Sequence, residues 1–146
     1  MSTLILDAGN SIIKAKTAGR EKSEVVFPHA ISQITEAEYS AVISRAKVNG
    51  TAQDYMRVNE TPYVIGESAE RHGVNVQRTG AARYTRDYYG VLAAAALARL
   101  YERSREIMVF GSHSPGDAKF REDLMKAVVG EWHVETADQD VHFRVT

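Results

Sequence analysis

The sequence of 146 residues contains no cysteine, only three prolines and a single tryptophan. Without cysteine, the chain can form neither a disulfide nor a thiolate metal site. The sequence also lacks an excess of charge of either sign, because it has 19 acidic and 18 basic residues and a formal net charge of −1. No general basic field attracts nucleic acid or an anionic membrane, so we expect any phosphate to be bound locally.

Long apolar runs are absent as well. The longest, residues 91–100, is about half of what a bilayer crossing requires. Residues 1–7 have neither the basic region nor the long apolar core of a signal peptide. We therefore expect a cytoplasmic protein with no membrane span. A chain of 146 residues, 44% of them apolar, suits a single compact domain over residues 1–146.

The segment with the clearest chemistry lies near the start of the chain. Residues 3–6 form a short apolar run fit for a buried strand, and residues 12–17 allow a second strand after a tight glycine turn. Asp7 ends the first strand, and Lys14 stands seven positions later. Because side chains alternate along a strand, this spacing predicts that the Lys14 ammonium returns beside the turn.

The tip of this hairpin predicts a phosphate site. Small residues there leave backbone N–H groups free to point at an anion, and Lys14 adds a point charge. Asp7 would hold the water of a divalent cation, since a carboxylate beside a phosphate repels it unless positive charge lies between them. Asp, Gly and Asn also suit an ordinary turn, and the position of Lys14 favours the phosphate site over that alternative.

The rest of the sequence predicts an α/β fold. Further strand patterns occupy residues 23–27, 54–59, 62–66, 106–111, 132–134 and 141–145. Helical patterns follow a capping box at 35–38, cover 67–72 and 84–103, and begin at 114–117. This order predicts helices packed on a mixed sheet that begins with three antiparallel strands.

The histidines give no metal signature in the sequence. They stand at His29, His72, His113, His133 and His142. None is paired with another at the i, i+4 spacing of a helical zinc site, and no cysteine can complete such a site. We expect no metal site from them.

The motif Asp7-x-Gly9-Asn10-Ser11-x-x-Lys14, together with the order of elements, resembles the first half of the actin-like ATPases. The likeness is greatest to plasmid-segregation and archaeal actin-like proteins of ParM type. Other pieces that resemble this family are residues 27–31, 63–69, 88–100 and 109–115. The resemblance covers nearly the whole chain and implies an RNase H-like, actin-like ATPase domain.

For the hairpin, the resemblance implies a nucleotide site. Asp7 would organise the water shell of a Mg²⁺ held by ATP or GTP. Gly9, Asn10 and Ser11 would contact the β- and γ-phosphates, and Lys14 would neutralise their charge.

In the family the nucleotide lies between two similar halves, and this sequence has no second Asp-x-Gly and no Gly-Gly run. We therefore expect the N-terminal half of a filament-forming ATPase, truncated before the second half. It should be inactive in hydrolysis on its own, because phosphoryl transfer needs groups placed on several sides. The implied partners are further copies of the protein and a DNA-bound adaptor protein.

Three other interpretations stay open. An RNase H-like nuclease or resolvase also begins with three antiparallel strands and an Asp on the first, and its further carboxylates could be Glu67, Asp87 and Asp140. A small-molecule kinase of the same superfamily opens with a similar hairpin. A non-catalytic binding or assembly module would keep the fold without turnover.

Overall fold

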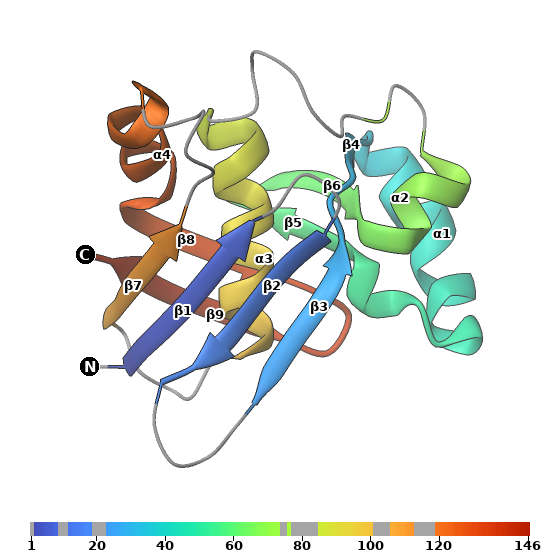
Figure 1. The fold of residues 1–146 in the computed structure, drawn as a ribbon. Helices are drawn as coiled ribbons and strands as arrows, with labels where there is room; N and C mark the ends of the chain where they lie inside the picture. Colours follow the sequence, from blue (N-terminus) through green and yellow to red (C-terminus); the bar gives the residue numbers. More distant parts are fainter. Residues whose placement is uncertain are drawn as a thin grey trace.

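The computed structural model describes residues 2–8, 12–18, 23–73, 76, 85–100, 106–112 and 119–146 (Figure 1). The strands are β1 Ser2–Ala8, β2 Ile12–Thr17, β3 Glu24–Pro28, β4 Ile31–Gln33, β5 Tyr55–Val58, β6 Thr61–Ile65, β7 Glu106–Ser112, β8 Gly130–Glu135 and β9 Asp140–Val145. The helices are α1 Glu36–Asn49, α2 Gly66–His72, α3 Val91–Arg99 and α4 Arg121–Val128, with a 3₁₀ turn η1 Ala52–Asp54 and a π-helical turn η3 Arg86–Gly90.

The described strands form one mixed sheet in the order β3-β2-β1-β7-β9-β8-β5-β6-β4. Strands β1, β2 and β3 pair antiparallel, whereas β7 runs parallel to both β1 and β9. The predicted α/β class and the opening meander of three antiparallel strands are therefore confirmed.

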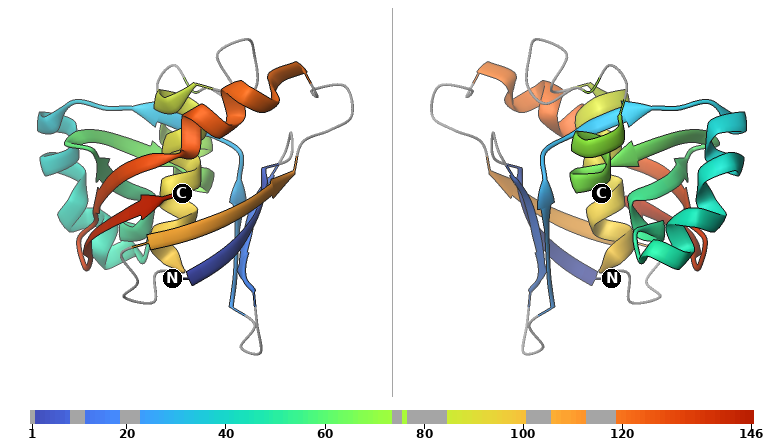
Figure 2. Two further views of the ribbon diagram at one scale, coloured as in Figure 1. Left: turned by 90° about the vertical axis from the view of Figure 1, so that its left-hand side faces the viewer. Right: turned by 90° about the vertical axis from the view of Figure 1, so that its right-hand side faces the viewer.

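Helix α3 is the centre of the hydrophobic core. The sheet bends, so that the β1–β2–β3 part and the β8–β9 part lie on two sides of this helix (Figure 2). Every residue from 91 to 98 is buried, as expected for a helix that is apolar all round. Its alanines leave room for strands on both sides, and Leu92 and Leu97 fill the space between them. Full burial of a leucine side chain contributes about 1.5–3 kcal/mol.

A smaller core lies between α1 and the β5–β6 hairpin. As the capping box predicts, the Thr35 hydroxyl accepts a hydrogen bond of 3.1 Å from the Glu38 backbone N–H. Tyr39 and Ala46 on the buried face of α1 belong to the same cluster as Val64 of β6. Thus α1 and α2 cover the β5–β6 end of the molecule (Figure 1).

The second hairpin is also confirmed, with its turn one residue earlier than expected. Asn59 and Glu60 have φ angles of 48° and 73°. Positive φ at both central residues is the geometry of the two-residue turn whose twist matches antiparallel strands.

The helix predicted over residues 84–103 is described as η3 followed by α3. The π-helical turn lies where the chain passes close to β8: a Cβ at Gly90 would lie 2.8 Å from the Trp132 ring. Gly130 begins β8 with a φ of 126°. The helix start predicted at 114–117 lies outside the described residues.

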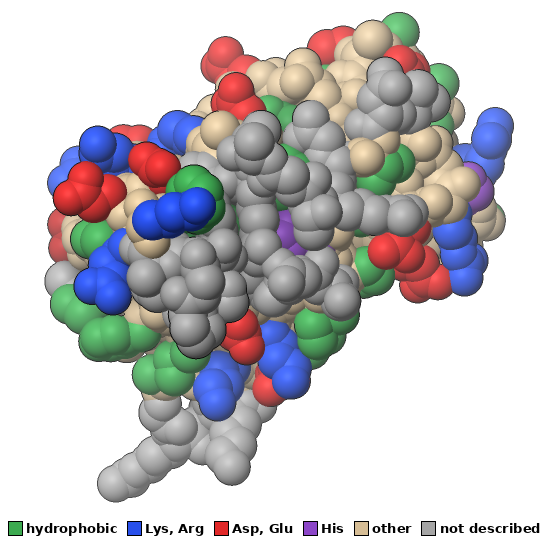
Figure 3. Space-filling model, turned by 45° about the horizontal axis from the view of Figure 1, so that its top comes forward, with side chains coloured by type: hydrophobic (Ala, Val, Ile, Leu, Met, Phe, Trp, Pro, Cys, Tyr) green, Lys and Arg blue, Asp and Glu red, His purple; other side chains and the backbone are tan. Residues whose placement is uncertain are grey.

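Charges of both signs are mixed on the surface. On the face seen in Figure 3, lysine and arginine side chains lie beside aspartate and glutamate side chains. This mixture agrees with the nearly neutral net charge of the sequence. No helix in the described ranges is long and apolar enough to cross a membrane.

Candidate functional site

The β1–β2 hairpin has one buried face and one exposed face. Leu4 and Leu6 of β1 are buried against the core, as is Ile13 of β2. Since successive side chains of a strand point to opposite faces, Asp7 and Lys14 lie on the outer face, and both are exposed.

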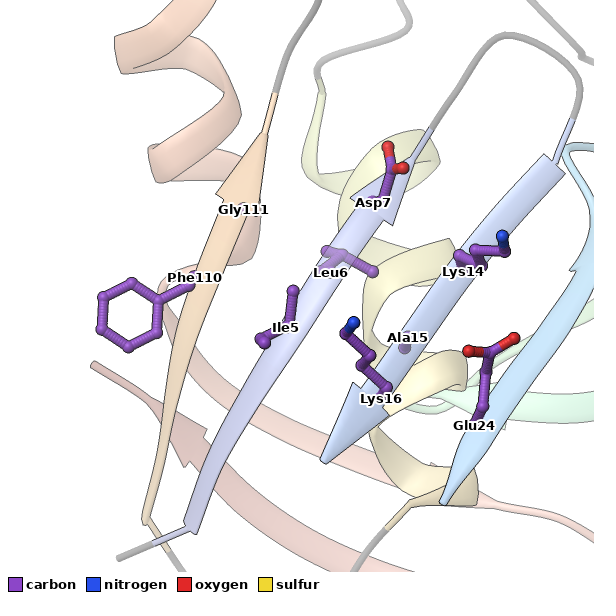
Figure 4. Close-up of a pocket in the computed structure, with 9 residues that line it drawn as sticks. All are labelled: Ile5, Leu6, Asp7, Lys14, Ala15, Lys16, Glu24, Phe110 and Gly111. Atoms are coloured by element: carbon purple, nitrogen blue, oxygen red, sulfur yellow. The ribbon is translucent and has the colours of Figure 1, made fainter. Parts of the chain in front are cut away.

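The register of the hairpin makes Asp7 and Lys14 direct neighbours. They are opposed partners in the β1–β2 ladder, and Cβ atoms of such a pair are about 4.5–5.5 Å apart. Figure 4 shows both side chains on the same face of the two strands. The structure thus brings together the two charged residues that the sequence singles out.

A cavity of about 410 Å³ extends from this pair along the outer face of the sheet. Its lining residues are Ile5, Leu6, Asp7, Lys14, Ala15, Lys16, Glu24, Phe110 and Gly111. Four of them are charged, two of each sign. The cavity therefore offers a carboxylate for a cation and an ammonium for an anion within one space.

The pair lies at the end of two parallel strands. Asp7 of β1 is opposed on its other side by Ser112 of β7, so that β1 and β7 both end at this edge. Open α/β sheets bind ligands beyond the carboxyl ends of their strands. Gly9, Asn10 and Ser11 follow β1 directly but lie outside the described residues, and their contacts with phosphate stay a prediction.

The site suits a magnesium-bound phosphate group. Mg²⁺ prefers oxygen ligands and keeps several of its waters, so a single exposed carboxylate can hold it through water. An ammonium next to that carboxylate suits a phosphate oxygen. Asp7 and Lys14 supply these two groups from adjacent strands.

The carboxylates that a nuclease would need are not gathered around Asp7. Glu67 lies on α2 and forms an ion pair with Arg71, and Asp140 lies on β9 beside His133. Asp87 belongs to η3. None of the three lines the cavity that contains Asp7, where the other described carboxylate is Glu24.

The structure also brings together side chains that the sequence leaves apart. His133 of β8 and His142 of β9 are opposed partners in the β8–β9 ladder, and Asp140 lies next to both. Their spacing of nine positions matches no helical metal motif. The alternation of apolar and polar residues in β8 and β9, on either side of the turn at residues 136–139, is the sequence signal that could have predicted this pairing of histidines.

Comparison with known families gives a match over almost the whole sequence. The sequence model of the family described as "Actin like proteins N terminal domain" matches residues 6–146. No curated protein is similar enough in sequence to count as a relative.

Several solved structures share the fold. A pCBH ParM described as a non-polymerisable quadruple mutant has a TM-score of 0.70 at 18% identity, covering 99% of this chain and 45% of that one. An archaeal actin homologue has a TM-score of 0.71 at 17% identity, with 100% and 43% covered. Bacillus thuringiensis ParM with AMPPNP has a TM-score of 0.64 at 16% identity, with 100% and 44% covered.

These likenesses show the actin-like fold. The chain spans less than half the length of the three structures.

Proposed function

This chain belongs to the family of actin-like protein N-terminal domains, and we propose that it is the phosphate-binding half of an ATPase that forms filaments. Its β1–β2 hairpin binds the phosphates of a Mg²⁺-nucleotide. The observation that carries this proposal is the direct opposition of Asp7 and Lys14 on the exposed face of the hairpin.

The two residues have complementary roles in binding. The Lys14 ammonium donates hydrogen bonds to phosphate oxygens, and such charge-assisted bonds are about twice as strong as neutral ones. The Asp7 carboxylate would accept hydrogen bonds from the water of a bound Mg²⁺, which would supply the positive charge needed between a carboxylate and phosphates.

Two further lines support a nucleotide as the ligand. Gly9, Asn10 and Ser11 follow Ala8 in the sequence, and the resemblance implies that they would supply backbone and side-chain donors for the β- and γ-phosphates. Bacillus thuringiensis ParM, which has the same fold, has structures with AMPPNP and with ADP.

Hydrolysis and assembly are proposed for a longer protein that contains this domain. Phosphoryl transfer depends on groups that surround the phosphate, and the hairpin reaches it from one side. A second domain would close the site and complete catalysis. One similar ParM is described as a non-polymerisable mutant. This description supports the proposal that nucleotide binding serves self-association.

Equilibrium binding of a fluorescent ATP analogue in the presence of Mg²⁺ tests this proposal. Loss of a hydrogen bond to a charged group is worth about 1.5–3 kcal/mol, so Lys14→Ala should weaken binding by about 10- to 100-fold. Lys47→Ala is the matched control, because Lys47 is an exposed lysine on α1 and its loss should leave the affinity unchanged. Equal affinity of Lys14→Ala and the wild type, or no binding by the wild type, would overturn the proposal.

A further inference from the structure

The outer face of the β8–β9 hairpin carries four potential metal ligands on two neighbouring pairs. His133 is opposed to His142, and Glu135 is opposed to Asp140. Between them, Trp132, Val134, Val141 and Phe143 point to the opposite face and are buried in the core. Alternation therefore places all four polar side chains on the same exposed face of the sheet.

Three of these groups are close enough to share one ion. The His133 Nε2 lies 2.6 Å from the Asp140 Oδ1, and the His142 Nε2 lies 3.9 Å from the same oxygen. One ligand atom from each of the three residues lies within 4.8 Å of the other two. A Glu135 carboxylate oxygen lies 3.5 Å from the His133 Nε2.

The two imidazole rings are stacked, with centroids 3.9 Å apart and an interplanar angle of 11°. Both Nε2 atoms lie near the Asp140 carboxylate, so two nitrogen ligands and one oxygen ligand are gathered at one place on the sheet. Metal ions bind the neutral form of imidazole.

We propose that His133, His142 and Asp140 bind a divalent transition-metal ion of the Zn²⁺ class, with Glu135 as a fourth ligand or as a partner of bound water. Two imidazoles and a carboxylate are a ligand set that such ions favour, whereas Mg²⁺ and Ca²⁺ prefer oxygen ligands alone. In tetrahedral zinc coordination, metal–ligand distances of about 2.0–2.2 Å place neighbouring ligand atoms roughly 3.4 Å apart. The observed separations of 2.6 and 3.9 Å lie on either side of that value.

Small side-chain rotations are enough to reach this geometry. The side chains of His142 and Asp140 are 73% and 65% exposed, so most of their surface faces solvent. His133 is 25% exposed and provides the fixed side of the site.

The backbone of His133 is held by Asn59, in the turn that follows β5. Its N–H donates to the Asn59 Oδ1, and its carbonyl accepts from the Asn59 backbone N–H, both at 2.8 Å. With His133 held in place, only the exposed side chains of His142 and Asp140 must be ordered when an ion binds. This lowers the entropic cost of binding.

The metal site is separate from the nucleotide site. In the sheet, β7 and β9 lie between β1 and β8, and the two hairpins flank α3 on different sides (Figure 2). Its ligands include none of the residues proposed to bind nucleotide, so it does not rest on the function proposed above.

Titration of the metal-free chain with Zn²⁺, measured by isothermal titration calorimetry in the absence of nucleotide, tests the proposal. We expect one ion per chain. Loss of an outer-shell partner weakens metal sites by about 10- to 100-fold, and removal of a ligand in His142→Ala should weaken binding by at least about 100-fold. His72→Ala is the matched control, because His72 is exposed on α2, and it should bind Zn²⁺ like the wild type.

A spectrum of the Co²⁺-loaded chain separates ligation from loss of fold. Visible absorption of Co²⁺ bound through nitrogen should be present in the wild type and in His72→Ala, and should be absent in His142→Ala and reduced in Asp140→Asn. Far-UV circular dichroism should be the same for all four proteins. No Zn²⁺ binding by the wild type, or equal binding by His142→Ala, would overturn the proposal.

Discussion

The β1–β2 and β8–β9 hairpins have the same construction and present different chemistry. Each packs alternate side chains against α3 and exposes the others. Among the outward-facing pairs, β1–β2 has Asp7 opposite Lys14, and β8–β9 has His133 opposite His142. The comparison shows that ladder register, rather than distance along the sequence, decides which side chains meet on the surface of this molecule.

The two pairs also differ in where they lie on their strands. Asp7 is next to the last described residue of β1. The histidines lie inside their ladder and are supported by the neighbouring pair Glu135–Asp140. The first pair therefore lies at the end of a strand, and the second lies within a ladder beside another pair of polar residues.

The greatest loss of stability should come from a cavity in the core that both hairpins share. Helix α3 contacts β1, β2 and β8, and Leu97 is fully buried in it. Leu97→Ala should lower the free energy of unfolding by about 2–5 kcal/mol, measured by urea denaturation.

Both surface sites should weaken together in Leu97→Ala under conditions where much of the protein is unfolded. As a control, Val48→Ala on α1 removes an apolar side chain that is 87% exposed and should leave stability nearly unchanged. Loss of only one site in Leu97→Ala would mean that the hairpins do not depend on one core.

A smaller effect should separate the two hairpins. The Arg86 guanidinium donates to the backbone carbonyls of Val129 and Glu131 at 2.9 and 2.8 Å and lies 4.0 Å from the centroid of the Trp132 ring. These contacts tie η3 to β8. Arg86→Ala should destabilise the protein by about 1–2 kcal/mol, measured by denaturation.

Hydrogen exchange shows where that stability is lost. In Arg86→Ala the amides of β8 and β9 should exchange faster, whereas those of β1 and β2 should change less. Arg86→Lys keeps the charge but not the paired donors, so it should fall between Ala and the wild type. Equal acceleration in both hairpins would contradict this assignment.

A third and weaker effect on stability should come from the ion pair of Arg57, which lies close to Glu135 beside the histidine pair. Arg57 of β5 donates to the Glu36 carboxylate at 3.0 Å and lies 3.9 Å from Glu135. The hydrogen bond from Arg57 lowers the pKa of Glu36 below its ordinary value of 4.5. A carboxylate whose pKa is depressed on folding stabilises the protein above its unfolded-state pKa, and this contribution is lost as the pH falls through the depressed value.

Glu36→Gln should therefore lower the melting temperature slightly at neutral pH and have no effect at a pH below the pKa of folded Glu36. Glu70→Gln, an exposed acid on α2, is the control and should match the wild type at both pH values. A difference between Glu36→Gln and the wild type that persists in acid would show that the ion pair is not its cause.

Local patterns in the sequence predict much of the fold. Alternation predicts the hairpins, and the box at Thr35 predicts the start of α1, because both depend on neighbours within a few residues. The opposition of Asp7 and Lys14 follows for the same reason, since a short turn fixes the register of the strands that it joins.

Features that depend on distant contacts are not visible in the sequence. The parallel pairing of β7 with β9 joins residues 106–107 to 144–145, and no local sequence pattern predicts it. The π-helical turn lies where the Arg86 guanidinium donates to the carbonyls of Val129 and Glu131 and where a Cβ at Gly90 would clash with the Trp132 ring. The opposition of His133 and His142 required the turn between β8 and β9, where the Thr136 N–H donates to the Gln139 carbonyl at 2.7 Å.

The most direct test of the nucleotide site compares ATP affinity of the wild type and of Asp7→Asn, each with Mg²⁺ and with a chelator. We expect Mg²⁺ to tighten ATP binding to the wild type and to have little effect on Asp7→Asn. With the chelator, Asp7→Asn should bind ATP at least as well as the wild type, because a carboxylate that repels bare phosphates has been removed. An Asp7→Asn variant that keeps the full Mg²⁺-dependent gain in affinity would contradict the role of the Asp7 carboxylate.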